Sequence, residues 1–112
     1  MADDCLFCSV VAGEVPATRL REDDDTLVFA DIDPQAPVHV LVIPKRHSRD
    51  IAELAADAAD SAAVLRAVAA YVRDQGLTDY RVVFNTGAGV GQTVFHVHAH
   101  VLAGRPMTWP PG

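Results

Sequence analysis

Three histidines occupy alternate positions near the end of the chain, at His96, His98 and His100. If this segment is a strand, alternate side chains share one face, so the three imidazoles form a single row. Neighbours in the row would lie roughly 7 Å apart and the outer pair roughly 14 Å apart, from the rise of a strand. One metal ion could bind an adjacent pair but hardly all three. One such histidine is usually an ordinary core residue, whereas three in register indicate chemistry.

The chemistry that suits this row is nucleophilic attack on phosphorus. Mutual repulsion and partial burial predict that at least one imidazole is neutral near pH 7 while another can remain charged. A neutral imidazole can form a phosphoryl-histidine that water then hydrolyses, and a cationic neighbour can stabilise the phosphate oxygens. The middle residue, His98, is the expected nucleophile. His39 lies in the apolar run of residues 37–43 and is expected to neighbour the row.

A glycine-rich segment, residues 85–93, leads directly into the histidines. Glycines alternate through it, and Gln92 and Thr93 close it. Glycines permit conformations that aim successive backbone N–H groups at one anion. A strand is expected after the segment instead of a helix, which argues against a Rossmann dinucleotide site. The glycines alone would fit a flexible hairpin equally well, but their adjacency to His98 predicts a phosphate loop.

Length, composition and charge limit the class of protein. The 112 residues, half of them hydrophobic, suit one compact domain over residues 1–112. The formal net charge of -6 repels polyanions, so we expect no nucleic-acid partner. The first residues lack a signal-peptide pattern, and the longest apolar run, residues 38–43, is too short to span a bilayer. We therefore expect a soluble, cytoplasmic protein with no membrane partner.

Hydrophobic periodicity and turn residues predict an α+β domain with an antiparallel sheet. The expected elements are a short helix over 6–12, strands over 19–22, 27–31 and 38–43, a long helix over about 57–75, and strands over 81–85 and 94–102. Gly13 and Pro16 are placed to end the first helix, and Gly76 the long one. The proline-containing tail, residues 105–112, is expected to be an extended arm carrying Trp109.

The two cysteines of the chain, Cys5 and Cys8, form a Cys-x-x-Cys pair. In a chain that is not secreted, this spacing indicates metal binding or redox chemistry more often than a structural disulfide. A tetrahedral zinc site needs four ligands, and the pair supplies only two. A thioredoxin-like role is disfavoured because no βαβ pattern surrounds the pair. Two reduced, buried thiols remain the alternative.

The histidine row resembles the signature of the histidine-triad (HIT) superfamily, which is His-x-His-x-His followed by two apolar residues. Other segments resemble its Hint branch, the histidine-triad nucleotide-binding phosphoramidases: DIDPQAP over 31–37, VIPKRH over 42–47, GQTVF over 91–95 and MTWPPG over 107–112. The resemblance implies a HIT-like fold with a five-stranded antiparallel sheet that extends across a homodimer, and a C-terminal arm near the partner's site. Dinucleoside-polyphosphate hydrolases of the superfamily fit less well because they lack the Trp-Pro-Pro-Gly ending. Hexose-phosphate nucleotidylyltransferases carry Gln where His100 stands.

The resemblance also implies an activity, hydrolysis of purine nucleoside 5'-phosphoramidates through a nucleotidyl-histidine intermediate on His98, with acyl-nucleotide anhydrides as a further class of substrate. The catalytic set carried over is His98, His100, Gln92, Thr93 and His39. The nucleotide contacts carried over are Leu6, Phe7, Val10, Phe29, Asp31, Ile32, Asn85, Gly91, Gln92, Thr93, His98 and His100. Within this set Asp31 would hold the ribose hydroxyls, and the apolar residues would line the pocket for an adenine or guanine base. Thr93 departs from the usual serine, which keeps the hydroxyl but adds a methyl group on the leaving-group side.

The superfamily further implies how the cysteine pair could be completed. Relatives with Cys-x-x-Cys near the start complete a site with two histidines, at positions matching His47 and His96. We therefore expect a structural zinc held by Cys5, Cys8, His47 and His96. Its binding would fix the geometry of the neighbouring nucleophile, and no metal is expected to be needed for catalysis itself.

Two other classes of function compete with the phosphoramidase. In one, the site only recognises a purine nucleotide and the protein is a regulatory or interaction module. In the other, the histidine row is itself a catalytic metal site, as in hydrolases with His-x-His ligation. A dinucleoside-polyphosphate hydrolase remains the alternative within the superfamily.

Overall fold

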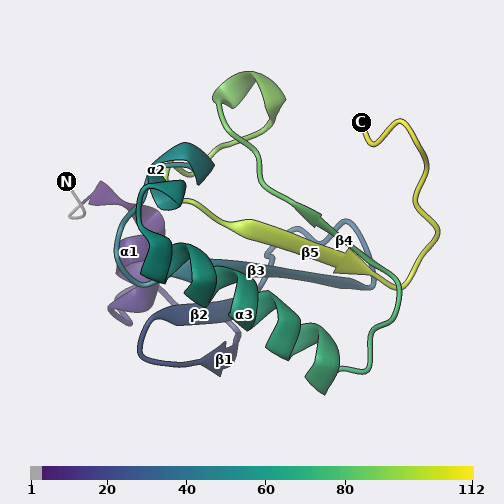
Figure 1. Ribbon diagram of the computed structural model, residues 1–112, viewed down its shortest axis with the longest axis horizontal. Helices are drawn as coiled ribbons and strands as arrows, with labels where there is room; N and C mark the ends of the chain where they lie inside the picture. The colour runs from purple at the N-terminus through teal and green to yellow at the C-terminus, as the bar shows by residue number, and fades with distance from the viewer. Residues whose placement is uncertain (1–3) are drawn as a thin grey trace.

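The computed structural model describes residues 4–112, and a five-stranded antiparallel sheet forms its centre (Figure 1). The elements in chain order are α1 Leu6–Val11, β1 Arg19–Glu22, β2 Thr26–Ala30, β3 Val38–Pro44, α2 Ile51–Ala55, α3 Ala58–Asp74, β4 Tyr80–Val83, the 3-10 helix η2 Ala88–Val90, and β5 Ala99–Ala103. The strand order across the sheet is β1-β2-β3-β5-β4. The α+β class and the five-stranded antiparallel sheet expected from the sequence are confirmed.

Helix α3 covers one face of the sheet, as the ribbon shows (Figure 1). Its apolar residues recur at helical spacing, and Val64, Val68 and Tyr71 are buried against the sheet. The Asp57 side chain caps its N-terminus by accepting from the Asp60 backbone N–H. Gly76, with φ of 67°, supplies the left-handed residue that ends it.

Helix α1 packs on the opposite face of the sheet. Phe7 and Val10 of α1 form a second apolar cluster with Leu27, Phe29, Leu41 and Ile43 of β2 and β3. Both faces of β2 and β3 are therefore buried, which explains why these strands read as continuous apolar runs in the sequence. The face covered by α1 is the one that carries the candidate active site.

Two sequence predictions of secondary structure were wrong. The strand expected over 94–102 begins only at Ala99, because the backbone before it turns toward the segment after β3, where the Val97 N–H donates to the Ser48 carbonyl at 2.6 Å. Helix α2 was not predicted, so the chain has a second short helix beside the long one. The sequence does contain a helix-start signal for α2, because Asp50 caps its N-terminus and an acidic residue, Glu53, follows three residues later.

The C-terminal arm, residues 105–112, follows β5 and leads away from the sheet (Figure 1). It contains no helix or strand, and Arg81 holds it through a hydrogen bond to the Thr108 carbonyl. Trp109 is 83% exposed at its end. Within residues 4–112, the helices are all too short or too polar to cross a bilayer.

Candidate active site and metal centre

A cavity of about 740 Å³ opens between α1, β2 and the segment that leads into β5. All the predicted nucleotide contacts except Asn85 and Gln92 line this cavity. Its floor is largely apolar, because Phe7, Phe29 and Leu41 come from the cluster under α1. Asp31 stands on its wall, and Ile32 is fully exposed at its mouth. The cavity thus combines a flat apolar region with polar groups at one end.

His98 lies at the polar end with its ring orientation fixed by two contacts. Its Nδ1 is 2.7 Å from the His96 carbonyl oxygen, which can only accept, so Nδ1 carries the proton. The Phe7 ring meets the imidazole edge to face, with centroids 5.1 Å apart. Because Nδ1 is protonated in the neutral ring, the lone pair resides on Nε2. The arrangement leaves His98 with a nucleophilic nitrogen in a cavity-lining side chain.

His39 and His100 form a hydrogen-bonded pair beside it. The Gln35 backbone N–H donates to His39 Nδ1 at 2.9 Å, which places the proton of the neutral ring on Nε2. That Nε2 lies 2.9 Å from His100 Nδ1 and 3.2 Å from Asp31 Oδ2. When His100 Nδ1 accepts, its own proton is on Nε2, a buried atom without a hydrogen-bond partner among the described residues. His100 thus offers an unpaired N–H donor at the cavity, suited to an oxygen of a bound anion.

The protonation states differ from those expected from the sequence. Burial, with the nearby imidazoles of His98 and His39, lowers the pKa of His100 to about 4. Burial also lowers the pKa of His98 and brings the pKa of His96 to about 4. The expectation that one member of the row stays cationic near pH 7 was therefore wrong, because desolvation outweighs the other influences. In the protein without ligand, His100 is therefore neutral, and it meets an incoming anion as a neutral N–H donor.

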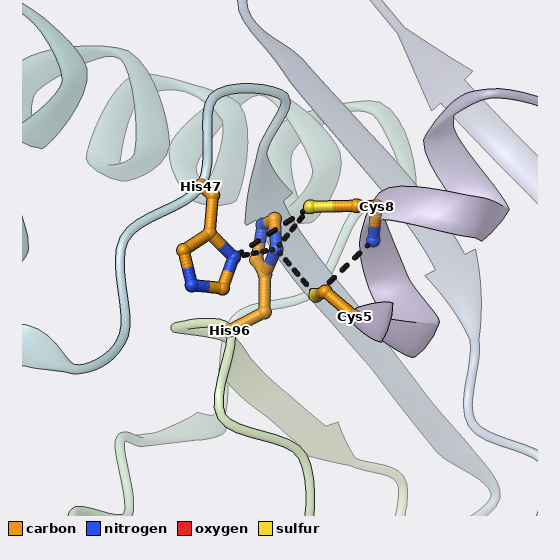
Figure 2. A group of neighbouring side chains, drawn as sticks. All are labelled: Cys5, Cys8, His47 and His96. Carbon is orange, nitrogen blue, oxygen red and sulfur yellow. Dashed lines mark hydrogen bonds between the residues drawn. The ribbon is translucent and has the colours of Figure 1, made fainter. Parts of the chain in front are cut away.

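His96 points away from the cavity, toward the cysteine pair (Figure 2). The sulfur atoms of Cys5 and Cys8 lie 3.3 Å and 3.4 Å from His96 Nδ1. His47 completes the group, with its Nδ1 3.3 Å from His96 Nδ1 and 3.6 Å from Cys8 Sγ. The four residues come from α1, from the segment after β3 and from the segment before β5. The structure therefore assembles the four ligands that the resemblance implied.

The geometry of this group fits a tetrahedral zinc ion. Zinc bonds of about 2.3 Å to sulfur and about 2.0 Å to nitrogen place neighbouring ligand atoms roughly 3.3 to 3.8 Å apart, and the measured separations lie in that range. His96 Nε2 lies 2.8 Å from the Pro44 carbonyl oxygen, so it carries the proton and leaves the Nδ1 lone pair facing the group. Without a metal, burial and the neighbouring Cys5 raise the pKa of Cys8 to about 11, so its thiol is protonated near neutral pH.

A second group, Asp31, His39 and His100, also brings potential ligand atoms within 4.8 Å of one another. Unlike His96 in the first group, His39 does not direct a free nitrogen lone pair at this group. His39 Nδ1 accepts from the Gln35 N–H, so Nε2 is protonated and has no lone pair for a metal. A metal at this position would require an imidazolate or the loss of the Gln35 hydrogen bond. The geometry therefore disfavours a catalytic metal site built on the histidine row.

Gln92 lies inside the glycine-rich segment instead of on the cavity wall. It is 2% exposed, and its Oε1 accepts from the Gly87 N–H at 2.9 Å. Its Nε2 donates to the carbonyls of Arg49 at 2.8 Å and Val94 at 3.2 Å. The side chain thus connects both ends of the segment to Arg49, two residues before α2. Asn85 also lies off the cavity, beside Gly91.

Gly91 and Thr93 are the members of the segment that reach the cavity. Gly91 has φ of 101°, a conformation that side chains rarely adopt, and it follows η2 directly. Sequence reasoning missed several other lining residues, which are Val15, Pro16, Ala17, Thr18, Ala30, Leu41 and Val94. They carry no reactive group, and only the way α1 closes over the sheet places them there.

Comparisons with known proteins agree with this fold. A family model for the HIT domain matches residues 12–107. An uncharacterized HIT-like protein of Synechocystis is 47% identical over the full length of both chains. A 14 kDa zinc-binding protein of Zea mays is 41% identical over 96% of this chain and 87% of its own. A crystal structure of a HIT family hydrolase from Legionella pneumophila superposes with a TM-score of 0.91, at 46% identity, over 97% of this chain and all of that one.

The chain belongs to the HIT family. The match covers the sheet, α3 and the whole histidine row.

Proposed function

We propose that this protein hydrolyses purine nucleoside 5'-phosphoramidates and belongs to the Hint branch of the family. The observation that carries the proposal is the orientation of His98, whose Nδ1 donates to the His96 carbonyl and whose Nε2 is left as the nucleophile. The cavity beside it has an apolar end for a base, the Asp31 carboxylate for ribose hydroxyls, and the His100 donor for a phosphate oxygen. No metal is required in this scheme.

The reaction divides into two displacements. In the first, His98 Nε2 forms a bond to the α-phosphorus while the P–N bond breaks, and the departing nitrogen gains a proton. Thr93, the last residue of the glycine-rich segment, lines the cavity, and in this scheme it contacts the leaving group. In the second, the oxygen of a water molecule forms a bond to phosphorus while the bond from phosphorus to His98 Nε2 breaks, which releases the nucleoside monophosphate; the proton that the water loses balances the one that the departing nitrogen gained. His100 stabilises the charge on the phosphate oxygens in both steps.

Zinc in the Cys5, Cys8, His47 and His96 group would have a structural role. It would join α1 to the segment that carries the nucleophile. The metal would supply folding free energy at this position, and His96 would contribute both a ligand nitrogen and the carbonyl that orients His98. The zinc-binding relative from Zea mays supports this proposal.

A homodimer is part of the proposal. Strand β4 ends the sheet, and its outer edge pairs with no strand within residues 4–112. An exposed edge of this kind can pair with the same strand of a second chain, which extends the sheet. Sedimentation at micromolar concentration should give the mass of two chains, and a monomer would contradict this part of the proposal.

The activity is tested by comparing His98→Ala with the native protein on an adenosine 5'-phosphoramidate. Loss of the nucleophile should lower kcat by at least about a thousandfold, while AMP binding measured by calorimetry is largely retained. Arg66→Gln is a suitable control, because this exposed residue of α3 lies on the opposite face of the sheet. Near-native turnover in His98→Ala would contradict the proposal. A higher kcat/KM for diadenosine polyphosphates than for the phosphoramidate would favour the alternative hydrolase.

A further inference from the structure

A second cavity, of about 460 Å³, adjoins the nucleotide cavity. The two share Leu6, Thr93 and Val94 in their walls. Under the proposed function Thr93 contacts the leaving group, and because Thr93 lines both cavities, a group that departs past it would enter the second cavity. The remaining lining residues are Asp4, Cys5, His47, Arg49 and Phe95. The proposed reaction involves none of their side chains directly.

Arg49 is the cation of this cavity, and its position is well defined. Its guanidinium carbon lies 5.7 Å from the centroid of the Phe95 ring, a cation–π contact with a half-exposed aromatic side chain. Its backbone is held on both sides, since the N–H donates to Glu53 Oε1 at 2.9 Å and the carbonyl accepts from Gln92 Nε2 at 2.8 Å. Two hydrogen bonds therefore hold the backbone of Arg49, and the Phe95 ring packs against its guanidinium.

The charges around Arg49 leave its guanidinium available. No carboxylate of residues 4–112 forms an ion pair with it. The Glu53 carboxylate accepts from the Arg49 backbone N–H instead, and the Asp4 carboxylate, which also lines the cavity, is exposed and forms no ion pair with Arg49. The His47 imidazole is directed toward the cysteines. A guanidinium that lines a cavity and has no acidic partner there is free to bind an external anion.

We propose that this cavity is a leaving-group subsite, and that it selects nucleoside phosphoramidates whose amine carries a carboxylate. The planar guanidinium presents paired N–H donors that match a carboxylate. The inference rests on the proposed phosphoramidase function and adds its substrate class. When the P–N bond breaks and the nitrogen takes up a proton, the product that leaves through this cavity is a free amino acid.

The test uses adenosine 5'-phosphoramidates of three amino acids of increasing length, glycine, 4-aminobutyrate and 6-aminohexanoate, each paired with its neutral carboxamide. The ratio of kcat/KM for the acid to that for the amide isolates recognition of the charge, because the two members of a pair share size and attachment. For at least one length, the native protein should prefer the acid about three- to tenfold. Arg49→Gln should bring that ratio to about one, and Arg49→Lys should retain part of it.

Two further variants test whether the acid-to-amide ratio depends on the charge at the wall of the second cavity. Asp4→Asn removes a repulsive carboxylate from the same wall and should raise the ratio, whereas Arg66→Gln, on the other face of the sheet, should not change it. A ratio near one at every length in the native protein would overturn the inference while leaving the phosphoramidase intact. So would a preference that persists in Arg49→Gln. Absence of hydrolysis of all six compounds would overturn the proposed function, and the subsite with it.

Discussion

The Nδ1 of His98 donates a 2.7 Å hydrogen bond to the carbonyl oxygen of His96, and the His96 side chain points into the cysteine group on the far side. One residue thereby belongs to both sites. Its backbone sets the tautomer of the proposed nucleophile, and its imidazole, fixed by the Pro44 carbonyl, faces the candidate metal position. The two sites are therefore expected to respond together to changes at His96.

The first prediction concerns metal content. Protein purified without an affinity tag should contain about one zinc ion per chain, because four ligand atoms are already at tetrahedral separations. Cys8→Ser should lose the metal and unfold at a lower temperature, since the ion supplies folding free energy. Elemental analysis with parallel thermal unfolding checks both points. Less than about half an equivalent of zinc per chain in the native protein would contradict the proposal that these four residues bind a structural zinc ion.

The second prediction concerns Gln92, whose three hydrogen bonds are internal to the loop and its neighbours. Gln92→Ala should cost about 1 to 3 kcal/mol of unfolding free energy, because it leaves buried groups without partners. Hydrogen exchange of residues 87–94 should accelerate in this variant. Gln92→Glu should be less stable still at neutral pH, because its carboxylate would face two carbonyl oxygens.

The same variants separate positioning from direct contact with substrate. If Gln92 acts through the loop, loss of activity in Gln92→Ala accompanies faster exchange. A large loss of activity with native exchange rates and native stability would instead indicate that its side chain reaches the phosphate, as the family resemblance implied.

The third prediction concerns pH. The pKa of His100 is about 4 in the folded chain against an ordinary value of 6.5, so the unfolded chain binds more protons between those values. Its contribution to stability is complete above about pH 6.5 and is lost as the pH falls toward about 4. The shift corresponds to about 3 kcal/mol. His100→Gln should lack this contribution, so its stability should fall less than that of the native protein.

Urea unfolding at about pH 7.5 and about pH 4.5 measures this difference, because groups that do not interact with His100 titrate alike in the two proteins. Parallel loss of stability in native and variant protein would show that His100 is not held neutral by its surroundings.

Much of the fold follows from local patterns in the sequence. The apolar repeat of α3, with Asp57 before it and Gly76 after it, predicted that helix almost to the residue. The three histidines lie on one face as expected, although the strand itself begins only at Ala99. Val97, Ala99 and Val101 pack under α3, and on the other face the rings of His96 and His98 both contact Phe7 of α1. His96 and His98 nevertheless reach different sites, because His96 faces the cysteine pair and His98 lines the cavity.

The internal position of Gln92 could not be predicted from the sequence. One of its partners is the backbone carbonyl of Arg49, which is distant in sequence, and the residue type at position 49 does not indicate that this carbonyl is free to accept. The tautomers of His39 and His98 depend likewise on a backbone N–H and a backbone carbonyl. The ligands of the metal group were accessible only through family resemblance. Spacing alone left the partners of the cysteine pair open.

The proposed mechanism requires that His98 becomes covalently attached to the nucleotide. The direct test is to mix the protein with an adenosine 5'-phosphoramidate, quench in the first turnovers, and locate the adduct by mass spectrometry. We expect one adenylyl group on the peptide containing His98, on that residue, and none in His98→Ala. Hydrolysis that proceeds with no adduct at any time point, or with an adduct on another residue, would contradict it.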